Sequence, residues 1–330
     1  MMTRAVIGGL GTYAPAKILT NHDLERIVDT NDEWILTRTG IRERHIAGPD
    51  ETTTDMAVQA SKLALAEAGI TGDQLDFIIV ATNTPDTLFP STAARLQSQL
   101  TASPIPGFDL QAGCTGLIYA LAMGSSLIQS GVYRRILVVG SDKLSSITDY
   151  QDRTTAVLFG DAAGAIVLEA ESDTEYGILA SYLKADGRCG DLLSLPAGGS
   201  RRPASEDSVR ERQHFLKMNG NETFRFAVKA MPEAVEEGLK TAGLTLDAMD
   251  LLVPHQANLR IIDAAIRRFN LDPDRVVVNI ERYGNTSVAT IPLALEDARR
   301  EGRLQPGHIV VLVAFGAGLT WGSNVIRWGR

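Results

Sequence analysis

Two stretches of the chain share the pattern that decides its fold: AGITGDQLDFIIV at residues 68–80 and AGLTLDAMDLLV at residues 242–253. Each has an Ala-Gly pair that ends a helical pattern, then an aspartate, then an apolar run. They are offset by 174 residues, and the apolar runs at 136–139 and 309–312 are offset by almost the same amount. This repetition predicts two copies of one βαβ-rich unit, with chance similarity between apolar strands as the alternative.

Apolar runs and helical patterns alternate along the whole chain, which is typical of an α/β protein with covered sheets. The expected strands are residues 5–10, 77–82, 136–141, 164–169, 251–253, 275–279 and 309–314. The expected helices are residues 54–68, 92–100, 115–130, 222–242, 259–269 and 288–301. Left-handed helix caps are expected at Gly69, Gly131, Gly243 and Gly302. We expect two halves, residues 1–172 and 173–330, packed about a pseudo-twofold axis.

Composition excludes several classes of protein. The 330 residues are 44% hydrophobic and 22% charged, as in soluble globular proteins. A net charge of -8 argues against nucleic acid as a partner. Only two cysteines occur, Cys114 and Cys189, which excludes a disulfide framework and favours a reducing, cytoplasmic location. The longest apolar run, residues 309–319, is too short to span a bilayer, so we expect no membrane association.

One segment does not fit the repeat. Residues 196–214 carry many charges and almost no apolar anchors. We expect a solvated surface loop, with a mobile lid at the entrance of a site as the alternative.

Cys114 is the first candidate for chemistry, because it stands where a short run ending at Leu110 gives way to a long uncharged helical pattern. The N-terminus of a helix and its free N–H groups favour thiolate over thiol, which would make Cys114 a nucleophile. A buried core cysteine is the alternative. In the second half, His255 directly follows an expected strand and Asn285 lies on a turn before an expected helix. A pseudo-twofold axis would bring the three side chains together.

Such a trio suits acyl transfer to sulfur followed by carbon–carbon bond formation. A thiolate attacks an acyl thioester, and backbone N–H groups of Cys114 and of the glycine turn at residues 315–318 would bind the oxyanion. If a malonyl thioester then loses carbon dioxide, N–H donors of His255 and Asn285 would stabilise the enolate. No metal or organic cofactor is required.

Other patterns offer weaker hypotheses. Residues 9–14 imitate a dinucleotide-binding fingerprint, but Pro15 stops the helix that would hold the pyrophosphate. The remaining histidines have no neighbours at metal-binding spacing and are expected on the surface or in loops: His22, His45, His214 and His308. Cys189 lies in a polar turn, where a resolving-thiol role is the alternative to a plain surface cysteine.

Five motifs, in order along nearly the whole chain, resemble β-ketoacyl-acyl-carrier-protein synthase III: residues 32–41, 113–116, 255–262, 284–287 and 315–322. The resemblance implies a homodimer with a thiolase-like fold, in which the duplicated halves form a five-layered αβαβα core. It implies an acyltransferase that condenses an acyl-CoA starter, such as acetyl-CoA, with malonyl-acyl carrier protein and so initiates fatty acid biosynthesis. Coenzyme A thioester would be a substrate and not a cofactor. Starter length and branching stay open.

The resemblance also implies roles for individual residues. Cys114 resembles the acyl-accepting nucleophile, His255 and Asn285 the decarboxylation pair, and Gly316 the partner of Cys114 in the oxyanion hole. Coenzyme A would be held by Trp34 and Arg153 stacked on its adenine, with Arg38 near its phosphates. Gly220 and Asn258 would line the pantetheine tunnel. Phe89 resembles the residue that a dimer partner inserts to close the acyl pocket.

An acidic carrier protein must dock on a local basic patch of this net-negative chain. The candidates lie on two expected helices: Arg225 and Lys229 on one, Arg260, Arg267 and Arg268 on the other. Solvated helix faces are the alternative for these charges.

Two other functions stay open at this point. A relative could use the same trio to acylate oxygen or nitrogen, or to condense substrates, in secondary metabolism. A non-catalytic module could bind acyl thioesters or carrier protein on the same scaffold.

Overall fold

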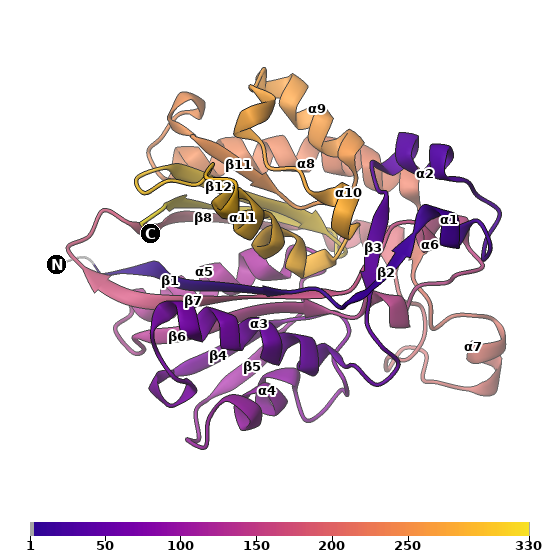
Figure 1. Cartoon of the computed structure of the whole chain (residues 1–330), viewed down its shortest axis with the longest axis horizontal. Helices are drawn as coiled ribbons and strands as arrows, with labels where there is room; N and C mark the ends of the chain where they lie inside the picture. Colours follow the sequence, from indigo (N-terminus) through magenta and orange to yellow (C-terminus); the bar gives the residue numbers. More distant parts are fainter. Residues whose placement is uncertain (1–2, 330) are drawn as a thin grey trace.

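Two sheets lie face to face with helices between them, and further helices cover their outer faces (Figure 1). The computed structural model describes residues 3–329. The strand order is β1-β7-β6-β4-β5 in the first sheet and β11-β12-β13-β8 in the second. The layers are therefore α, β, α, β and α, which confirms the predicted five-layered α/β architecture.

The first sheet and its helices come from the first part of the chain. Its strands are β1 (Thr3–Tyr13), β4 (Phe77–Ala81), β5 (Gly107–Leu110), β6 (Arg135–Asp142) and β7 (Ala162–Ser172). The outer face is covered by α3 (Thr53–Ala68) and α4 (Thr92–Leu100), and the inner face by α5 (Gly116–Gln129).

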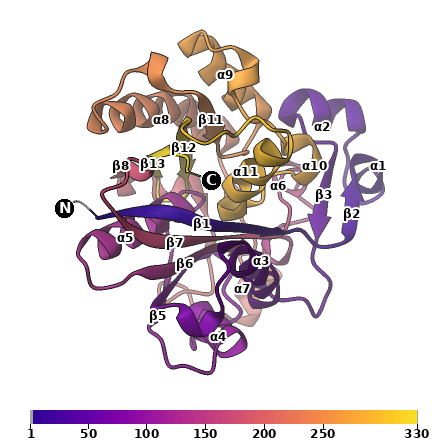
Figure 2. The same cartoon turned by 60° about the vertical axis from the view of Figure 1, so that its left-hand side comes forward.

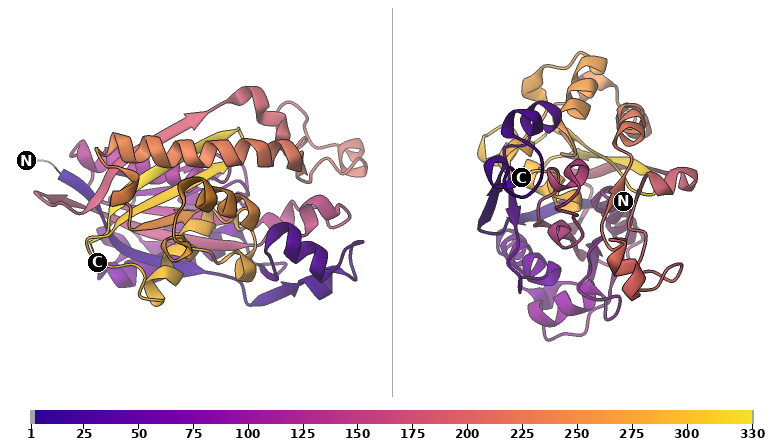
Figure 3. Two further views of the ribbon diagram at one scale, coloured as in Figure 1. Left: turned by 90° about the horizontal axis from the view of Figure 1, so that it is seen from above. Right: turned by 90° about the vertical axis from the view of Figure 1, so that its right-hand side faces the viewer.

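The second sheet repeats this arrangement. Its strands are β8 (Gly177–Ala185), β11 (Leu251–Pro254), β12 (Ile309–Gly316) and β13 (Thr320–Arg327). The outer helices are α8 (Gly220–Thr241) and α9 (Leu259–Phe269), and the inner one is α11 (Thr290–Arg300). Figure 3 shows α8 running along the second sheet. The chain passes from one sheet to the other between β7 and β8.

Strand registers reveal how closely the two units correspond. Phe77 pairs with Ile136 in the first sheet, and Leu251 pairs with Val310 in the second. Both members of the second pair lie 174 residues after their counterparts. The four predicted glycine caps all have positive φ angles, from 67° at Gly69 to 78° at Gly131. The repeated sequence pattern thus corresponds to a repeated structure.

Alternation along the central strands supplies three apolar layers. Ile136 of β6 packs toward α5 and the space between the sheets, whereas Leu137 packs toward α3. Likewise, Val310 of β12 faces the inner layer and Val311 faces α8. Successive side chains of a strand point to opposite faces, so these continuous apolar runs are buried on both sides.

The expected strand at residues 275–279 is wrong. This segment makes a single parallel bridge, between Val276 and Leu252, where the first half has the regular strand β5. Side chains bind its carbonyl groups instead: Arg303 Nη2 donates to Val276 O at 2.9 Å, and Gln256 Nε2 donates to Val277 O at 3.0 Å. Because side chains donate hydrogen bonds to these carbonyl groups, the segment does not need the hydrogen bonds of a neighbouring strand.

Strands β8 and β13 were missed because their sequences mix polar and apolar residues. Ser323 and Asn324 of β13 are fully buried, yet both are hydrogen-bonded. Ser323 Oγ donates to Ala234 O at 2.6 Å, and Asn324 Nδ2 donates to Ile118 O at 3.0 Å. Burial of satisfied polar groups is compatible with a central strand, but it hides the apolar pattern that predicts one.

Shorter elements gather at one end of the sandwich (Figures 1 and 2). They are β2 (Lys17–Thr20), α1 (Asn21–Leu24), α2 (Asp32–Thr39), β3 (Glu43–Ile46), α6 (Arg153–Ala156), β9 (Leu193–Ser194), α7 (Glu206–Arg210), β10 (Lys217–Met218) and α10 (Ile280–Tyr283). The charged segment at 196–214 contains α7 and is tied down by an ion pair of 2.5 Å between Arg212 and Asp149. In residues 3–329, no helix combines the length and apolar character needed to cross a membrane.

Candidate active site

A cavity of about 740 Å³ opens where α2, α8 and α9 approach one another. Cys114, His255 and Asn285 all line it, together with Gly316. Its outer part is lined by residues of α2, the start of α8 and the start of α9, among them Trp34, Arg38, Gly220, Phe224, Asn258 and Arg260. The fold therefore brings the three expected reactive side chains to one space, although 171 residues separate Cys114 from Asn285.

Cys114 lies at the elbow between β5 and α5, where the two halves touch. A Cβ atom on Gly316 would lie 2.4 Å from the Cys114 backbone nitrogen, and one on Gly113 would lie 2.6 Å from the Ala317 nitrogen. Only glycine fits at either position, because the elbow packs directly against the end of β12. The backbones of Cys114 and Gly316 thus lie against each other, and both residues line the cavity.

The protonation state of Cys114 differs from the expectation of a thiolate. Burial raises the pKa of the thiol to about 11, and the charge of nearby Asp142 adds to the rise. The Ser287 hydroxyl, whose Oγ lies 3.5 Å from Sγ, lowers the pKa but does not offset burial. The raised pKa of Cys114 runs against the expected thiolate, because desolvation disfavours the charged form of the sulfur.

His255 follows β11, and its backbone N–H donates to Val313 O at 2.7 Å. The side chain is 1% exposed, and its Nδ1 lies 2.7 Å from Thr290 Oγ1 at the start of α11. Burial lowers the pKa of His255 to about 3, so the imidazole is neutral near neutral pH. Because Thr290 contacts Nδ1, Nε2 is the ring nitrogen left for a ligand.

Asn285 is held by its backbone and by one end of its carboxamide. Its N–H donates to Leu158 O at 2.9 Å, and its carbonyl accepts from Gly160 N at 3.0 Å. The side-chain Oδ1 accepts from Ser287 N at 2.9 Å. Since the oxygen is engaged, the Nδ2 group is the end of the carboxamide that can donate to a ligand.

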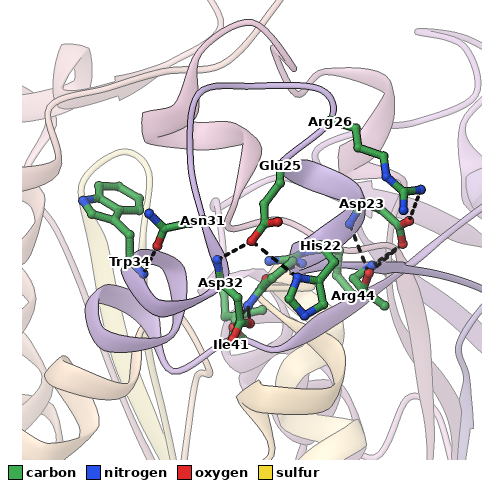
Figure 4. A network of polar contacts seen from close by, with 11 residues as sticks. His22, Asp23, Glu25, Arg26, Asn31, Asp32, Trp34, Ile41 and Arg44 are labelled. Atoms are coloured by element: carbon green, nitrogen blue, oxygen red, sulfur yellow. Dashed lines mark hydrogen bonds and ion pairs between the residues drawn. The ribbon is translucent and has the colours of Figure 1, made fainter.

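Trp34 stands at the mouth of the cavity on α2. Asn31 caps this helix by accepting from Trp34 N at 2.8 Å, and the indole projects away from the polar contacts around it (Figure 4). The guanidinium carbons of Arg153 and Arg38 lie 5.1 Å and 5.8 Å from the ring centroid, within cation–π range. Arg153 does not line the cavity directly, but it stacks on a residue that does.

Asn258 and Arg260 shape the cavity wall from the start of α9. Asn258 Oδ1 caps the helix by accepting from Arg260 N at 2.9 Å, and its Nδ2 donates to Arg38 O at 3.0 Å, which joins α9 to α2. The Arg260 guanidinium carbon lies 5.2 Å from the ring centroid of Phe224 on α8. Gly220, the first residue of α8, also lines the cavity.

This arrangement brings a thiol, an imidazole and a carboxamide to one cavity, with arginine side chains also lining it. Those are the groups that acyl transfer to sulfur and stabilisation of an enolate require. Among residues 3–329, no cluster of three or more His, Cys, Asp or Glu side chains has the geometry to hold a metal ion.

Comparison with known proteins identifies the family. Residues 108–187 match the family described as 3-oxoacyl-[acyl-carrier-protein (ACP)] synthase III, and residues 239–328 match its C-terminal family. The chain is 52% identical over 326 residues to the β-ketoacyl-[acyl-carrier-protein] synthase III of Caldanaerobacter subterraneus subsp. tengcongensis, covering 99% of this chain and 98% of that protein. The chain belongs to the β-ketoacyl-acyl-carrier-protein synthase III family.

Further relatives of this synthase III chain agree. The synthase III of Symbiobacterium thermophilum is 54% identical over 324 residues, covering 98% of each protein. The crystal structure of the synthase III from Aquifex aeolicus VF5 superposes with a TM-score of 0.90 and 45% identity, covering 98% of this chain and all of that one.

Some residues expected in this synthase III site lie outside the cavity. Phe89 is 85% exposed on the loop between β4 and α4. Arg225 is exposed on α8 and forms an ion pair of 2.6 Å with Glu222. The other expected docking cations, Lys229, Arg267 and Arg268, are also exposed and do not line the cavity.

Four residues next to the reactive groups escaped the sequence analysis of this synthase III chain: Asn83, Asp142, Ser287 and Thr290. One signal could have found the first two. Asn83 follows β4 and Asp142 ends β6, and these parallel neighbours end at the same edge of the sheet. Functional groups collect at the carboxyl ends of parallel strands.

Proposed function

We propose that this chain catalyses the decarboxylative condensation of an acyl-CoA starter with malonyl-acyl carrier protein through an acyl group carried on Cys114. The observation that carries the proposal is the common cavity of Cys114, His255 and Asn285 in a member of the synthase III family. The product is a β-ketoacyl-acyl carrier protein, which makes the reaction an initiating step of fatty acid biosynthesis.

In the first half-reaction, Cys114 sulfur attacks the thioester carbonyl of the starter. The oxyanion of the tetrahedral intermediate is bound by the backbone N–H groups of Cys114 and Gly316, whose backbones are in contact. The bond between carbon and the coenzyme A sulfur then breaks, and the proton of the thiol ends on coenzyme A. The acyl group stays on Cys114.

In the second half-reaction, the malonyl thioester loses carbon dioxide. The electron pair of the broken bond forms an enolate, whose oxygen accepts hydrogen bonds from His255 Nε2 and Asn285 Nδ2. The lowered pKa of His255 keeps the imidazole uncharged, so one ring nitrogen carries a proton and the other is an acceptor. The enolate carbon attacks the acyl carbonyl, the bond to Cys114 sulfur breaks with its electron pair going to sulfur, and a proton from solvent restores the thiol.

The cations at the cavity mouth fit a coenzyme A thioester. Trp34 and Arg153 would hold the adenine between them, with Arg38 near the phosphates, and Gly220 and Asn258 would flank the pantetheine arm. The 5.1 Å between Arg153 and the Trp34 ring leaves no room for a base, so Arg153 must swing outward when coenzyme A binds. No metal or organic cofactor takes part in these steps.

We further propose a division of labour between residues 1–172, which supply the nucleophile, and residues 173–330, which supply the decarboxylation pair. Carrier protein would dock over Arg225 and Arg260, near the cavity mouth. Both cysteines are free, which supports a reducing, cytoplasmic location.

Mass spectrometry after mixing with acetyl-CoA tests the proposal. We expect one acetyl group on the peptide that contains Cys114, followed by its loss and by release of carbon dioxide when malonyl-acyl carrier protein is added. A protein that binds acetyl-CoA without forming the adduct would be a binding module. Transfer of the acetyl group to oxygen or nitrogen without carbon dioxide release would identify an acyltransferase instead.

We also propose a homodimer, supported by two large apolar side chains exposed on one loop, Leu88 (82%) and Phe89 (85%). Phe89→Ser should shift the protein toward monomer in analytical ultracentrifugation. Val209→Ser is the matched control, because Val209 is also exposed (63%) but lies on α7. Equal behaviour of both variants would contradict a dimer interface at Phe89.

A further inference from the structure

Ser287 has no role in the proposed mechanism, yet it contacts Cys114, Asn285 and the threonine that contacts His255. Its Oγ lies 3.5 Å from Cys114 Sγ, and its backbone N–H donates to Asn285 Oδ1 at 2.9 Å. Its carbonyl accepts from Thr290 Oγ1 at 3.0 Å, and that hydroxyl contacts His255 Nδ1. The backbone of Ser287 therefore braces the decarboxylation pair, while its hydroxyl faces the nucleophile.

The orientation of the Ser287 hydroxyl is set by Asn83. The Asn83 Nδ2 atom lies 3.1 Å from Ser287 Oγ and 2.8 Å from Asp142 Oδ2. A carboxamide nitrogen carries two hydrogens, and here one donates to each of these oxygens. Because Asn83 donates into the Ser287 oxygen, the proton of the hydroxyl itself is left for another acceptor.

Two acceptors compete for that proton, the Asp142 carboxylate and the Cys114 sulfur. Asp142 is fully buried and already accepts from Thr82 Oγ1 at 3.1 Å, from Asn83 N at 2.6 Å and from Thr84 Oγ1 at 3.1 Å. In residues 3–329, by contrast, the Ser287 hydroxyl is the one side-chain donor within hydrogen-bonding distance of Cys114 Sγ. As negative charge grows on sulfur, the sulfur becomes the acceptor that gains most from the proton.

The nucleophile needs such a donor. Burial raises the pKa of Cys114 to about 11, and the Asp142 charge raises it further, whereas the Ser287 hydroxyl lowers it. His255 cannot form an ion pair with a thiolate near neutral pH, because burial lowers its pKa to about 3. Apart from the backbone amides around the elbow, Ser287 is therefore what stabilises charge on the sulfur.

We propose that Ser287 is a further catalytic residue, whose hydroxyl donates a hydrogen bond to Cys114 sulfur, and that Asn83 and Asp142 are positioning residues that aim it. The inference rests on the proposed function. The hydrogen bond strengthens when the sulfur loses its proton to attack the acyl thioester. It strengthens again when the bond between acyl carbon and sulfur breaks during condensation and the electron pair returns to sulfur.

Ser287→Gly removes the hydroxyl and so tests its contribution separately from that of the backbone. Ser287 has a φ of +51°, which glycine adopts without strain, and both backbone groups that brace Asn285 and Thr290 are kept. In a Cys189→Ser background, which removes the exposed second thiol, the rate of alkylation by iodoacetamide is measured against pH. We expect alkylation near neutral pH to fall about 10-fold and its pH profile to shift upward by about one unit.

Two further variants guard against misfolding as an explanation. Ser287→Ala should slow alkylation to the same extent, because it also lacks the hydroxyl. Ser61→Ala, which removes a fully buried hydroxyl on α3 that has no hydrogen-bond partner, should leave both the rate and the pH profile unchanged.

A double-mutant cycle tests the positioning role of Asn83. Asn83→Ala alone should slow alkylation less than Ser287→Gly, and it should have no further effect in the Ser287→Gly background. An undiminished effect there would refute the positioning role. An unchanged alkylation profile in Ser287→Gly would overturn the whole inference. If the parent protein takes no acetyl group from acetyl-CoA, the proposed function fails, and the alkylation data still judge Ser287 separately.

Discussion

The elbows of the two halves have the same place in the fold but different local structures. In the first half, α5 begins two residues after Cys114, and β5 forms a regular ladder with β4. In the second half, a 3₁₀ turn at Ser287–Ala289 precedes α11, and the counterpart of β5 makes only one bridge. Asn285 lies two residues before this 3₁₀ turn, and His255 directly follows β11. Duplication supplies the frame, and the second half adds two functional groups to it.

The two halves also surround their reactive groups with different polar neighbours. The Cys114 sulfur faces a polar network of Ser287, Asn83 and Asp142, whereas His255 is buried with one side-chain hydrogen bond, to Thr290. This contrast fits a group that must carry charge in one half and a neutral donor in the other. Variants that separate the two half-reactions therefore test the comparison.

The largest effect should come from Cys114→Ala. We expect condensation to fall by about 10⁴-fold or more, because no other group can hold the acyl chain. Carbon dioxide release from malonyl thioester should persist, since the second half is intact. Mass spectrometry and trapping of labelled carbon dioxide measure the two activities, with Cys189→Ala as the unaffected control. An acetyl adduct on Cys114→Ala would refute the assignment.

Asn285→Ala should produce the opposite pattern. Loss of one donor to the enolate should lower carbon dioxide release by about 10² to 10³-fold, while acetylation of Cys114 continues. The same two assays measure both quantities in one preparation. If acetylation falls as far as decarboxylation, the halves do not divide the chemistry as proposed.

Thr290→Val should sharpen the contrast with a smaller effect. Valine keeps the shape of threonine but has no hydroxyl to contact His255 Nδ1, so it removes the hydrogen-bond partner that orients the imidazole. We expect decarboxylation about 10-fold slower, unchanged acetylation, and recovery with Thr290→Ser. Failure of serine to restore decarboxylation would point to packing and not to the hydrogen bond.

Arg260→Glu should have the smallest effect, and only on the carrier substrate. We expect the KM for malonyl-acyl carrier protein to rise about 5-fold, with the difference shrinking in high salt and acetylation by acetyl-CoA unaltered. Arg268→Glu is the matched control, because Arg268 lies on the same helix but forms an ion pair with Glu236. Equal effects of both variants would argue against docking at Arg260.

Sequence patterns predicted most of the frame because they act locally. The expected bounds of α4 and α9 agree with the structure, and the glycine caps have the expected conformation. These features depend on propensity, capping and apolar spacing within about 15 residues. The expected strand at 275–279 failed because its backbone is satisfied by Gln256 and Arg303, and no local pattern reveals such partners.

The candidate site likewise has features that the sequence predicted and features that it did not. Their places next to expected strands and helices, together with motif order, suggested Cys114, His255 and Asn285, and the cavity they share is consistent with that choice. The pKa of Cys114 is raised, against the expected thiolate, because desolvation depends on the folded environment and not on the position at the start of a helix.

The amino-acid sequence by itself determined the duplicated α/β frame and which reactive side chains the protein carries, because apolar periodicity and residue chemistry are written along the chain. Only the tertiary structure decided how those groups are protonated and which neighbours aim them. Asn83, Asp142 and Ser287 come from three separate segments and Ser287 alone among them contacts Cys114, so desolvation and hydrogen-bond direction exist only once those segments are packed together.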